Sequence, residues 1–210
     1  GARSQEGVIA LSQYGRIFKK TCEASGVIPQ VSVILGPCAG GAVYCPALTD
    51  FIVMTRDNSH MFVTGPDVVR ATTGEDVSFE DLGGAVVHNF QSGVAHYLAD
   101  DEADALDYTR TLLTYLPPNC EGAARRWDYE EGPEDAANAA RLSQIVPESS
   151  KQPYDMVEVI RALVDYGEFV QVQEMFAQSI TVGFAAFDGE SVGIVANNPM
   201  HEAGTLDVDA

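Results

Sequence analysis

Two adjacent glycines, Gly40 and Gly41, are the residues of this chain whose placement most directly suggests chemistry. They follow a β-branched apolar run at 31–35 and precede small and apolar residues from Ala42 onward. This pattern predicts a strand, a tight turn and the first turn of a helix that continues through 43–48. Glycine lets a ligand approach the backbone, and the first N–H groups of a helix lack intrahelical acceptors. Such groups, with the helix dipole, can form an oxyanion hole.

Other functions of a glycine-rich turn are tested by the neighbouring residues. A phosphate-binding P-loop requires lysine and a hydroxyl residue where Ala42 and Val43 stand, so the sequence excludes it. No G-x-G-x-x-G motif accompanies a strand, and a dinucleotide-binding site therefore has no motif either. A purely structural role, in which Gly40 and Gly41 permit close helix packing, stays open from the residues alone.

Reactive side chains give weaker signals. The four histidines, at 60, 88, 96 and 201, lack the spacing of a metal-binding pair, and no serine lies in a G-x-S-x-G turn. The acidic residues at 100–102 precede a long amphipathic pattern, which favours a helix cap over a pair of catalytic carboxylates. We expect structural or surface histidines and no metal site.

The elements that must position the glycine pair follow from hydrophobic spacing. We expect helices at 6–24, from 65 onward and at 99–116, and strands at 31–35, 51–54 and 60–64. Prolines, glycines and charges interrupt every period in 117–153, which predicts an interdomain linker. A second unit is expected to contain a helix at 154–164 and two strands, 180–187 and 191–196. Asp188-Gly189 between these strands is a strong hairpin signal.

Composition limits the class of protein. The chain has 210 residues, 46% of them hydrophobic, which is enough for a substantial core. Its 31 acidic and 12 basic residues give a net charge of −19, so nucleic acid is excluded as a partner. A uniform negative charge is typical of proteins that work in strong salt, where repulsion is screened, although an ordinary acidic enzyme stays open. No apolar run is long enough for a membrane span, and we expect a cytoplasmic protein.

Several motifs in fixed order resemble one family. The chain is similar to the carboxyltransferase β subunits of biotin-dependent acyl-CoA carboxylases, above all those of propionyl-CoA carboxylases. The motifs are Gly-Ala-Arg-Ser-Gln-Glu-Gly at 1–7, Gly-Val-Ile-Pro-Gln at 26–30, Gly-Pro-Cys-Ala-Gly-Gly-Ala at 36–42, Thr-Gly-Pro-Asp-Val-Val at 64–69, and Gly-Gly-Ala at 83–85 with Ser-Gly-Val-Ala-His at 92–96. They extend over nearly the whole chain, except for 118–143.

The resemblance implies an α/β fold of the crotonase type, a ββα-spiral built from two similar halves. Residues 1–116 would be the later part of the N half, 117–153 a linker, and 154–210 the start of the C half. The family implies that the chain is a piece of a longer polypeptide. It also implies an active site formed by the N half of one subunit and the C half of another.

The resemblance further implies transfer of a carboxyl group from carboxybiotin to the α-carbon of propionyl-CoA or acetyl-CoA, through enolates held by backbone donors. Gly40 and Gly41 match catalytic oxyanion donors, and Gly1, Ala2, Ala39 and Ala42 match substrate-binding positions. Biotin would arrive on a separate carrier, and the partners would be a biotin carboxylase or carrier subunit and further copies of this subunit. Another crotonase-type hydratase, isomerase or decarboxylase, or a non-catalytic scaffold module, remains an alternative.

Overall fold

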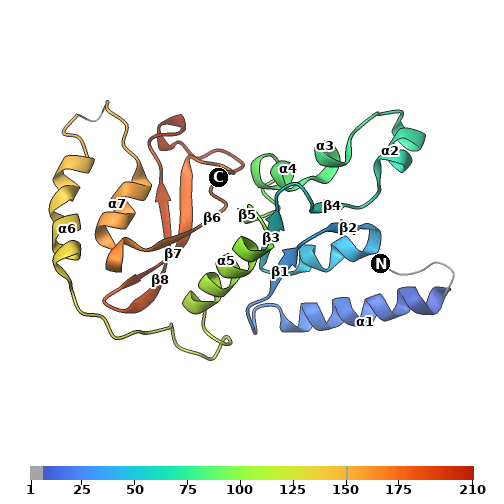
Figure 1. The fold of residues 1–210 in the computed structure, drawn as a ribbon, viewed down its shortest axis with the longest axis horizontal. Coiled ribbons are helices and arrows are strands. Elements are labelled where there is room, and N and C mark those ends of the chain that lie inside the picture. Colours follow the sequence, from blue (N-terminus) through green and yellow to red (C-terminus); the bar gives the residue numbers. More distant parts are fainter. Residues whose placement is uncertain (1–6, 150) are drawn as a thin grey trace. The chain divides into compact units, whose positions relative to one another are not determined.

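The computed structural model describes residues 7–149 and 151–210, apart from the side chain of Leu11. The described chain divides into two compact units, which differ in architecture (Figure 1). The first contains the residues up to Arg110 together with Pro118–Glu121, and the second contains Thr111–Pro117 and the residues from Gly122 onward. In the described part of the chain, no helix has the length and apolar character needed to cross a membrane.

Parallel strands organise the first unit. Strands β1 (Val31–Ile34), β3 (Phe51–Thr55) and β5 (Tyr97–Ala99) form a sheet in the order β1-β3-β5. A second small sheet pairs β2 (Pro37–Ala39) in parallel with β4 (His60–Phe62). The expected strands at 31–35, 51–54 and 60–64 are therefore confirmed, whereas β2 and β5 are too short for a periodicity signal.

Helices of the first unit begin where the sequence provides starting signals. The helix expected at 6–24 is α1 (Val8–Ala24), and Gly65 precedes α2 (Pro66–Thr73), with proline in its first turn. Two short helices follow, α3 (Phe79–Gly83) and α4 (Ala85–Phe90). The helix expected at 99–116 is α5 (Glu102–Tyr115). It begins later than expected because 97–99 belong to β5. Val53, Ala99 and Ala105 are fully buried and form the centre of this unit's core.

The second unit is an antiparallel sheet covered by helices. Strands β6 (Phe169–Val172), β7 (Ile180–Phe187) and β8 (Glu190–Asn197) lie in that order. Helix α7 (Met156–Leu163) packs Ile160 against Ala185 of β7, and α6 (Pro133–Ile145) contacts α7. The expected hairpin is confirmed: Asp188 and Gly189 both have positive φ, 49° and 73°, which is the backbone geometry of a type I′ turn.

Two expectations need correction. The segment 117–153 is not devoid of structure, since it contains α6, whose start combines Pro133 with an Asp135 carboxylate that accepts the Gly132 N–H at 2.9 Å. Its alanine-rich sequence has a weak apolar face, which hid the helix from a periodicity search. The α-helix expected at 43–48 is instead two short 3₁₀ helices, η2 (Gly40–Tyr44) and η3 (Pro46–Leu48), separated where Pro46 begins the second. The division into crotonase halves at 117–153 stays a prediction.

Candidate active site

The glycine pair lies at the start of η2, directly after β2. Gly40 has a φ of 63°, a backbone conformation that residues with a Cβ rarely adopt, so glycine is required for the sharp change of direction between β2 and η2. Gly41 has no positive φ, and a Cβ added to it would meet no described atom within 4 Å. Gly40 therefore shapes the turn, while Gly41 leaves space beside the backbone.

The 3₁₀ geometry of η2 determines which backbone N–H groups at its start lack an acceptor within the helix. In a 3₁₀ helix capped by Ala39, the N–H groups of Gly40 and Gly41 precede the first i→i+3 bond and have no acceptor within the helix. The parallel pairing of Ala39 with Phe62 directs the Gly40 N–H toward the Phe62 carbonyl, so Gly41 is the donor that the strand pairing leaves uncommitted. The first i→i+3 bond of the helix is the one that the Ala42 N–H can donate to the Ala39 carbonyl. The helix has five residues and not the several turns of an α-helix, so local N–H groups contribute more to anion binding here than a macrodipole does.

Packing holds this turn on three sides. Val43 is buried, and Tyr44 contacts Phe18 of α1 with ring centroids 6.0 Å apart. After η3, the Thr49 hydroxyl donates to Ser32 Oγ at 2.9 Å or to the Pro46 carbonyl at 2.7 Å. These contacts anchor the end of η2 and the residue after η3, while Ala39 and Gly41 remain exposed.

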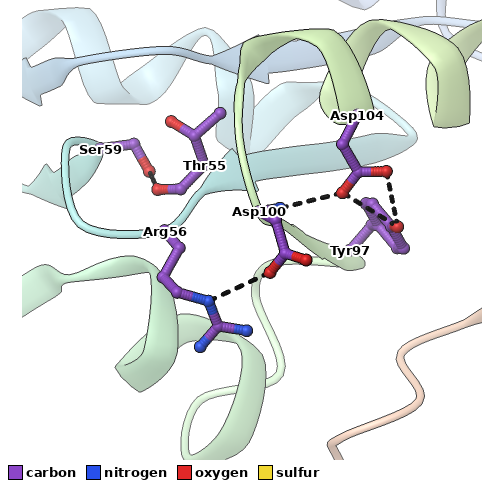
Figure 2. A network of polar contacts seen from close by, with 6 residues as sticks. All are labelled: Thr55, Arg56, Ser59, Tyr97, Asp100 and Asp104. Atoms are coloured by element: carbon purple, nitrogen blue, oxygen red, sulfur yellow. Dashed lines mark hydrogen bonds and ion pairs between the residues drawn. The ribbon is translucent and has the colours of Figure 1, made fainter.

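A polar network, which the sequence analysis did not identify, fixes the carboxyl ends of β3 and β5 (Figure 2). The backbone N–H of Arg56 donates to the Ala99 carbonyl at 2.8 Å, and its side-chain Nε–H donates to the Asp100 carboxylate at 3.3 Å. Asp104 accepts the Tyr97 hydroxyl at 3.1 Å and the Asp100 N–H at 2.9 Å. The Arg56 contacts join residues more than 40 positions apart in the sequence, so no local pattern could have indicated them, whereas the Asp104 contacts are local.

The same region connects the network to β1. The hydroxyl of buried Thr55 lies 3.3 Å from the Ile34 carbonyl and close to Asn58 Oδ1, and it can donate to one of them at a time. Ser59 donates its hydroxyl to the Thr55 carbonyl at 2.7 Å (Figure 2). Ile34 is the last residue of β1, and the chain then enters the glycine turn. The network therefore supports the strand end from which the candidate site begins.

The acidic residues at 100–102 behave as the sequence predicts. Asp101 precedes α5 and accepts the Asp104 N–H at 2.9 Å, which is the geometry of a helix N-cap. Asp100 contacts Arg56 instead of pairing with another carboxylate. The expectation of a helix cap is confirmed.

Histidines in the first unit make structural contacts. His96 Nδ1 accepts the Ile52 N–H at 3.0 Å, and burial lowers the pKa of His96. His88 Nε2 lies 2.7 Å from the Met61 carbonyl. His60 Nε2 lies 2.5 Å from Glu80, a carboxylate contact that its sequence neighbours do not suggest, and its buried Nδ1 has no hydrogen-bond partner in the described structure. Among the described residues, no group of three or more His, Cys, Asp or Glu is placed to hold a metal ion.

The structure therefore brings four of the predicted site residues together, Ala39, Gly40, Gly41 and Ala42, in one turn. The other two, Gly1 and Ala2, lie outside the described residues. The turn provides backbone donors beside open space and, from Ala39 to Val43, no titratable side chain. It can stabilise an oxyanion, and it supplies no acid or base of its own.

Comparison with known proteins gives a consistent result. The sequence pattern of the carboxyl transferase domain matches residues 1–210. The chain is 57% identical, over its full length, to the propionyl-CoA carboxylase beta chain of Saccharopolyspora erythraea, and covers 40% of that protein. It is 53% identical to the methylmalonyl-CoA decarboxylase subunit alpha of Veillonella parvula, again over its full length, and covers 41% of that protein.

A solved structure supports the same assignment. The transcarboxylase 12S structure, a hexamer with hydrolysed methylmalonyl-CoA bound, matches the whole chain with a TM-score of 0.92 and 44% identity, and the match covers 41% of that chain. The chain thus spans about two fifths of the length of these relatives. The fold is α/β of the crotonase type, as the family resemblance implies. By the match over its full length, the chain belongs to the carboxyl transferase domain family.

Proposed function

We propose that this chain is part of a carboxyltransferase subunit that moves a carboxyl group from carboxybiotin to the α-carbon of a short acyl-CoA, propionyl-CoA or acetyl-CoA. The start of η2 is the observation that carries the proposal: two N–H groups precede the first helical bond, and Gly41 leaves space for a ligand. The propionyl-CoA carboxylase beta chain, at 57% identity, supports the substrate class.

Backbone donors suit this reaction because an enolate places negative charge on an oxygen atom, and preorganised N–H groups stabilise such charge. Gly40 and Gly41 donate to that oxygen in the proposal, and Ala39 and Ala42 line its approach. Carboxybiotin, held by a separate carrier, supplies the carboxyl group when it is bound. The open space beside Gly41 fits a planar group that approaches the backbone closely.

Partners belong to the same proposal. The transcarboxylase 12S structure is a hexamer, which supports assembly from several copies of this subunit. A separate biotin carboxylase or carrier subunit follows from the proposed use of carboxybiotin. Nucleic acid and membranes have no role in the proposal, and a cytoplasmic location remains our prediction.

Decarboxylation of an acyl-CoA is the second candidate, because a relative at 53% identity is a methylmalonyl-CoA decarboxylase subunit. It would use the same donors, since loss of the carboxyl group also leaves an enolate. A hydratase, an isomerase or a non-catalytic scaffold has no comparable support from the relatives described above.

The experiment uses the intact protein and the reverse reaction. Methylmalonyl-CoA is incubated with and without free biotin, and propionyl-CoA is quantified by chromatography. Carboxyl transfer predicts propionyl-CoA formation that depends on biotin, whereas a decarboxylase forms it without biotin. Crotonyl-CoA tests for a hydratase in parallel. Binding of methylmalonyl-CoA without any turnover would reject both leading candidates, and absence of binding would favour the scaffold.

We also propose that the net charge of −19 adapts the protein to strong salt. Repulsion within the chain, and between the chain and anionic CoA, weakens as the Debye length falls to about 3 Å at 1 M salt. The thermal midpoint and the activity should therefore rise as KCl increases from about 0.1 to about 3 M. A midpoint that stays constant or falls would favour an ordinary acidic enzyme.

A further inference from the structure

A cavity of about 340 Å³ lies entirely within the second unit, and neither the glycine turn nor the polar network contributes to it. Its lining comes from four separate segments: the end of α5, residues 127–129, residues 165–168 and the β7–β8 turn. The volume is within the usual range of small-ligand pockets, roughly 300–1,000 Å³. It can therefore accept a ligand about the size of an amino-acid side chain or somewhat larger.

Aromatic rings form much of the cavity wall. Tyr115 and Trp127 make an edge-to-face pair with centroids 5.5 Å apart, and Tyr129 and Tyr166 make another at 5.3 Å. Tyr115 is 8% exposed, whereas Trp127 and Tyr166 are 39% and 61% exposed. One end of the cavity is thus buried, and the other presents aromatic surface to solvent. The face of an aromatic ring carries negative charge density and attracts cations.

Charge on the lining has one sign. Asp128, Asp165 and Glu168 contribute carboxylates, and no lysine, arginine or histidine of the described chain lines the cavity. Asp165 is 7% exposed and is held by the N–H groups of Asp188 at 3.0 Å and Gly189 at 2.7 Å. Its position is therefore fixed by the turn, and it does not depend on a basic side chain.

Both tyrosines that face these acids report a negative surrounding. Burial, followed by Glu168 and Asp165, raises the pKa of Tyr115. Partial burial, followed by the Asp135 carboxylate, raises the pKa of Tyr129 to about 12. Only the carboxylate contribution to each shift reflects nearby negative charge, and that contribution disfavours a further negative charge at this place.

We infer that this cavity binds an organic cation, a quaternary ammonium or guanidinium group, between its aromatic rings and carboxylates. A neutral apolar ligand would cover the rings and leave Asp128 and Glu168 without a cation beside them, and a metal ion would not need the rings. An organic cation satisfies both, because its apolar surface packs on the rings while its charge faces the carboxylates. The cation can come from a free small molecule or from an arginine side chain of a protein.

Calorimetric titration of the intact protein tests this inference with two charged probes and their neutral isosteres. Choline is compared with 3,3-dimethylbutanol, and N-acetylarginine amide with N-acetylcitrulline amide, at constant ionic strength. We expect a charged probe to bind about tenfold more tightly than its isostere, the difference that one good cation–π contact can supply. Preference for choline indicates a free ammonium compound, and preference for the arginine derivative indicates a protein side chain.

Variants locate the binding site. Asp128→Asn combined with Glu168→Gln should lower the affinity for the preferred probe several-fold. Glu174→Gln changes an exposed acid of the same unit outside the cavity and should leave this affinity unchanged. Wild-type Trp127 fluorescence gives a second measurement that needs no substitution, because a bound cation should alter its emission. Equal binding of charged and neutral probes, or no saturable binding of either charged probe, would overturn the inference.

Discussion

The glycine turn of the first unit and the aromatic cavity of the second unit present different chemical groups to a ligand. The turn offers backbone N–H groups from residues adjacent in sequence and has no titratable side chain from Ala39 to Val43. The cavity offers rings and carboxylates from four segments, and backbone N–H groups only fix one of its acids. The first suits a negative charge that develops during a reaction, and the second suits a permanent positive charge.

The largest expected effect comes from filling the space in the turn. Gly41→Val should lower kcat/KM for carboxyl transfer by about 100-fold or more, because the side chain would occupy the place of the reacting oxygen. The fold should tolerate it, since Gly41 has an ordinary φ and no described atom within 4 Å of the new Cβ. Steady-state kinetics and a thermal melt of the intact protein measure the two effects.

Two other glycines control this experiment. Gly15→Val changes an exposed helical glycine whose added Cβ would meet no described atom within 4 Å, and it should leave activity unaltered. Gly40→Ala should destabilise the protein by about 1 kcal/mol because of its positive φ. Normal activity of the Gly41 variant would remove the oxyanion assignment.

Backbone crowding should be more severe at the β7–β8 turn than at Gly40. A Cβ at Gly189 would collide with the Trp127 carbonyl oxygen, and its φ is positive, so Gly189→Ala should cost about 2–3 kcal/mol. Gly193→Ala, in the following strand, meets nothing within 4 Å and should be nearly neutral. Urea unfolding followed by Trp127 fluorescence compares the variants. Equal stability of the two would contradict the described packing around the hairpin turn.

Asp165 tests whether the cavity depends on the same turn. Asp165→Asn should destabilise the second unit by about 1–2 kcal/mol, because one amide oxygen cannot accept both the Asp188 and Gly189 N–H groups as the carboxylate does. Asp188→Asn is the matched control, since asparagine tolerates a positive φ. The denaturation midpoints of the two variants should differ, and coincident midpoints would argue against this role of Asp165.

Acid should affect the two units at different pH values. Burial lowers the pKa of His96 in the folded protein below the ordinary histidine value of about 6.5, so the unfolded chain binds more protons near that pH. The stability of the protein should therefore fall as pH decreases below about 6.5. In the second unit, the Gly132 N–H lowers the pKa of Asp135 below 3.8, so its contribution should persist until pH falls below that value. His96→Asn keeps a hydrogen-bond acceptor but removes the group that titrates. If the denaturation midpoints of the wild type and the variant change in parallel from pH 8 to about 5, the prediction is contradicted.

Sequence patterns predicted the fold best where signals are local. Asp188-Gly189 identified the hairpin because a two-residue turn with positive φ strongly favours such a dipeptide. Helix α6 was missed because its alanines give little amphipathic contrast. The helix after Gly41 was assigned the wrong type, since a short apolar run fits an α-helix and a 3₁₀ helix equally well, and Pro46 decides between them.

The glycine turn and the aromatic cavity also differ in whether their sequence signals are local. Ala39–Ala42 could be found because all four positions are contiguous, although their catalytic role remains a prediction. The cavity could not be found, because Tyr115, Trp127 and Asp165 come together only after the sheet and its flanking segments have formed. The contact between Arg56 and Asp100 could not be predicted for the same reason.

The β7–β8 hairpin also has a consequence for folding kinetics. Its register begins at Phe187 and Glu190, across the shortest possible loop, and continues to Ile180 and Asn197. The parallel pairs of the first unit, such as Val53 with Tyr97, must instead close long loops before any strand contact forms. Hairpins form within about 1–10 μs, so we expect β7 and β8 to acquire protection from hydrogen exchange before the parallel sheet does. The hairpin would then serve as an early nucleus on which the rest of the second unit condenses.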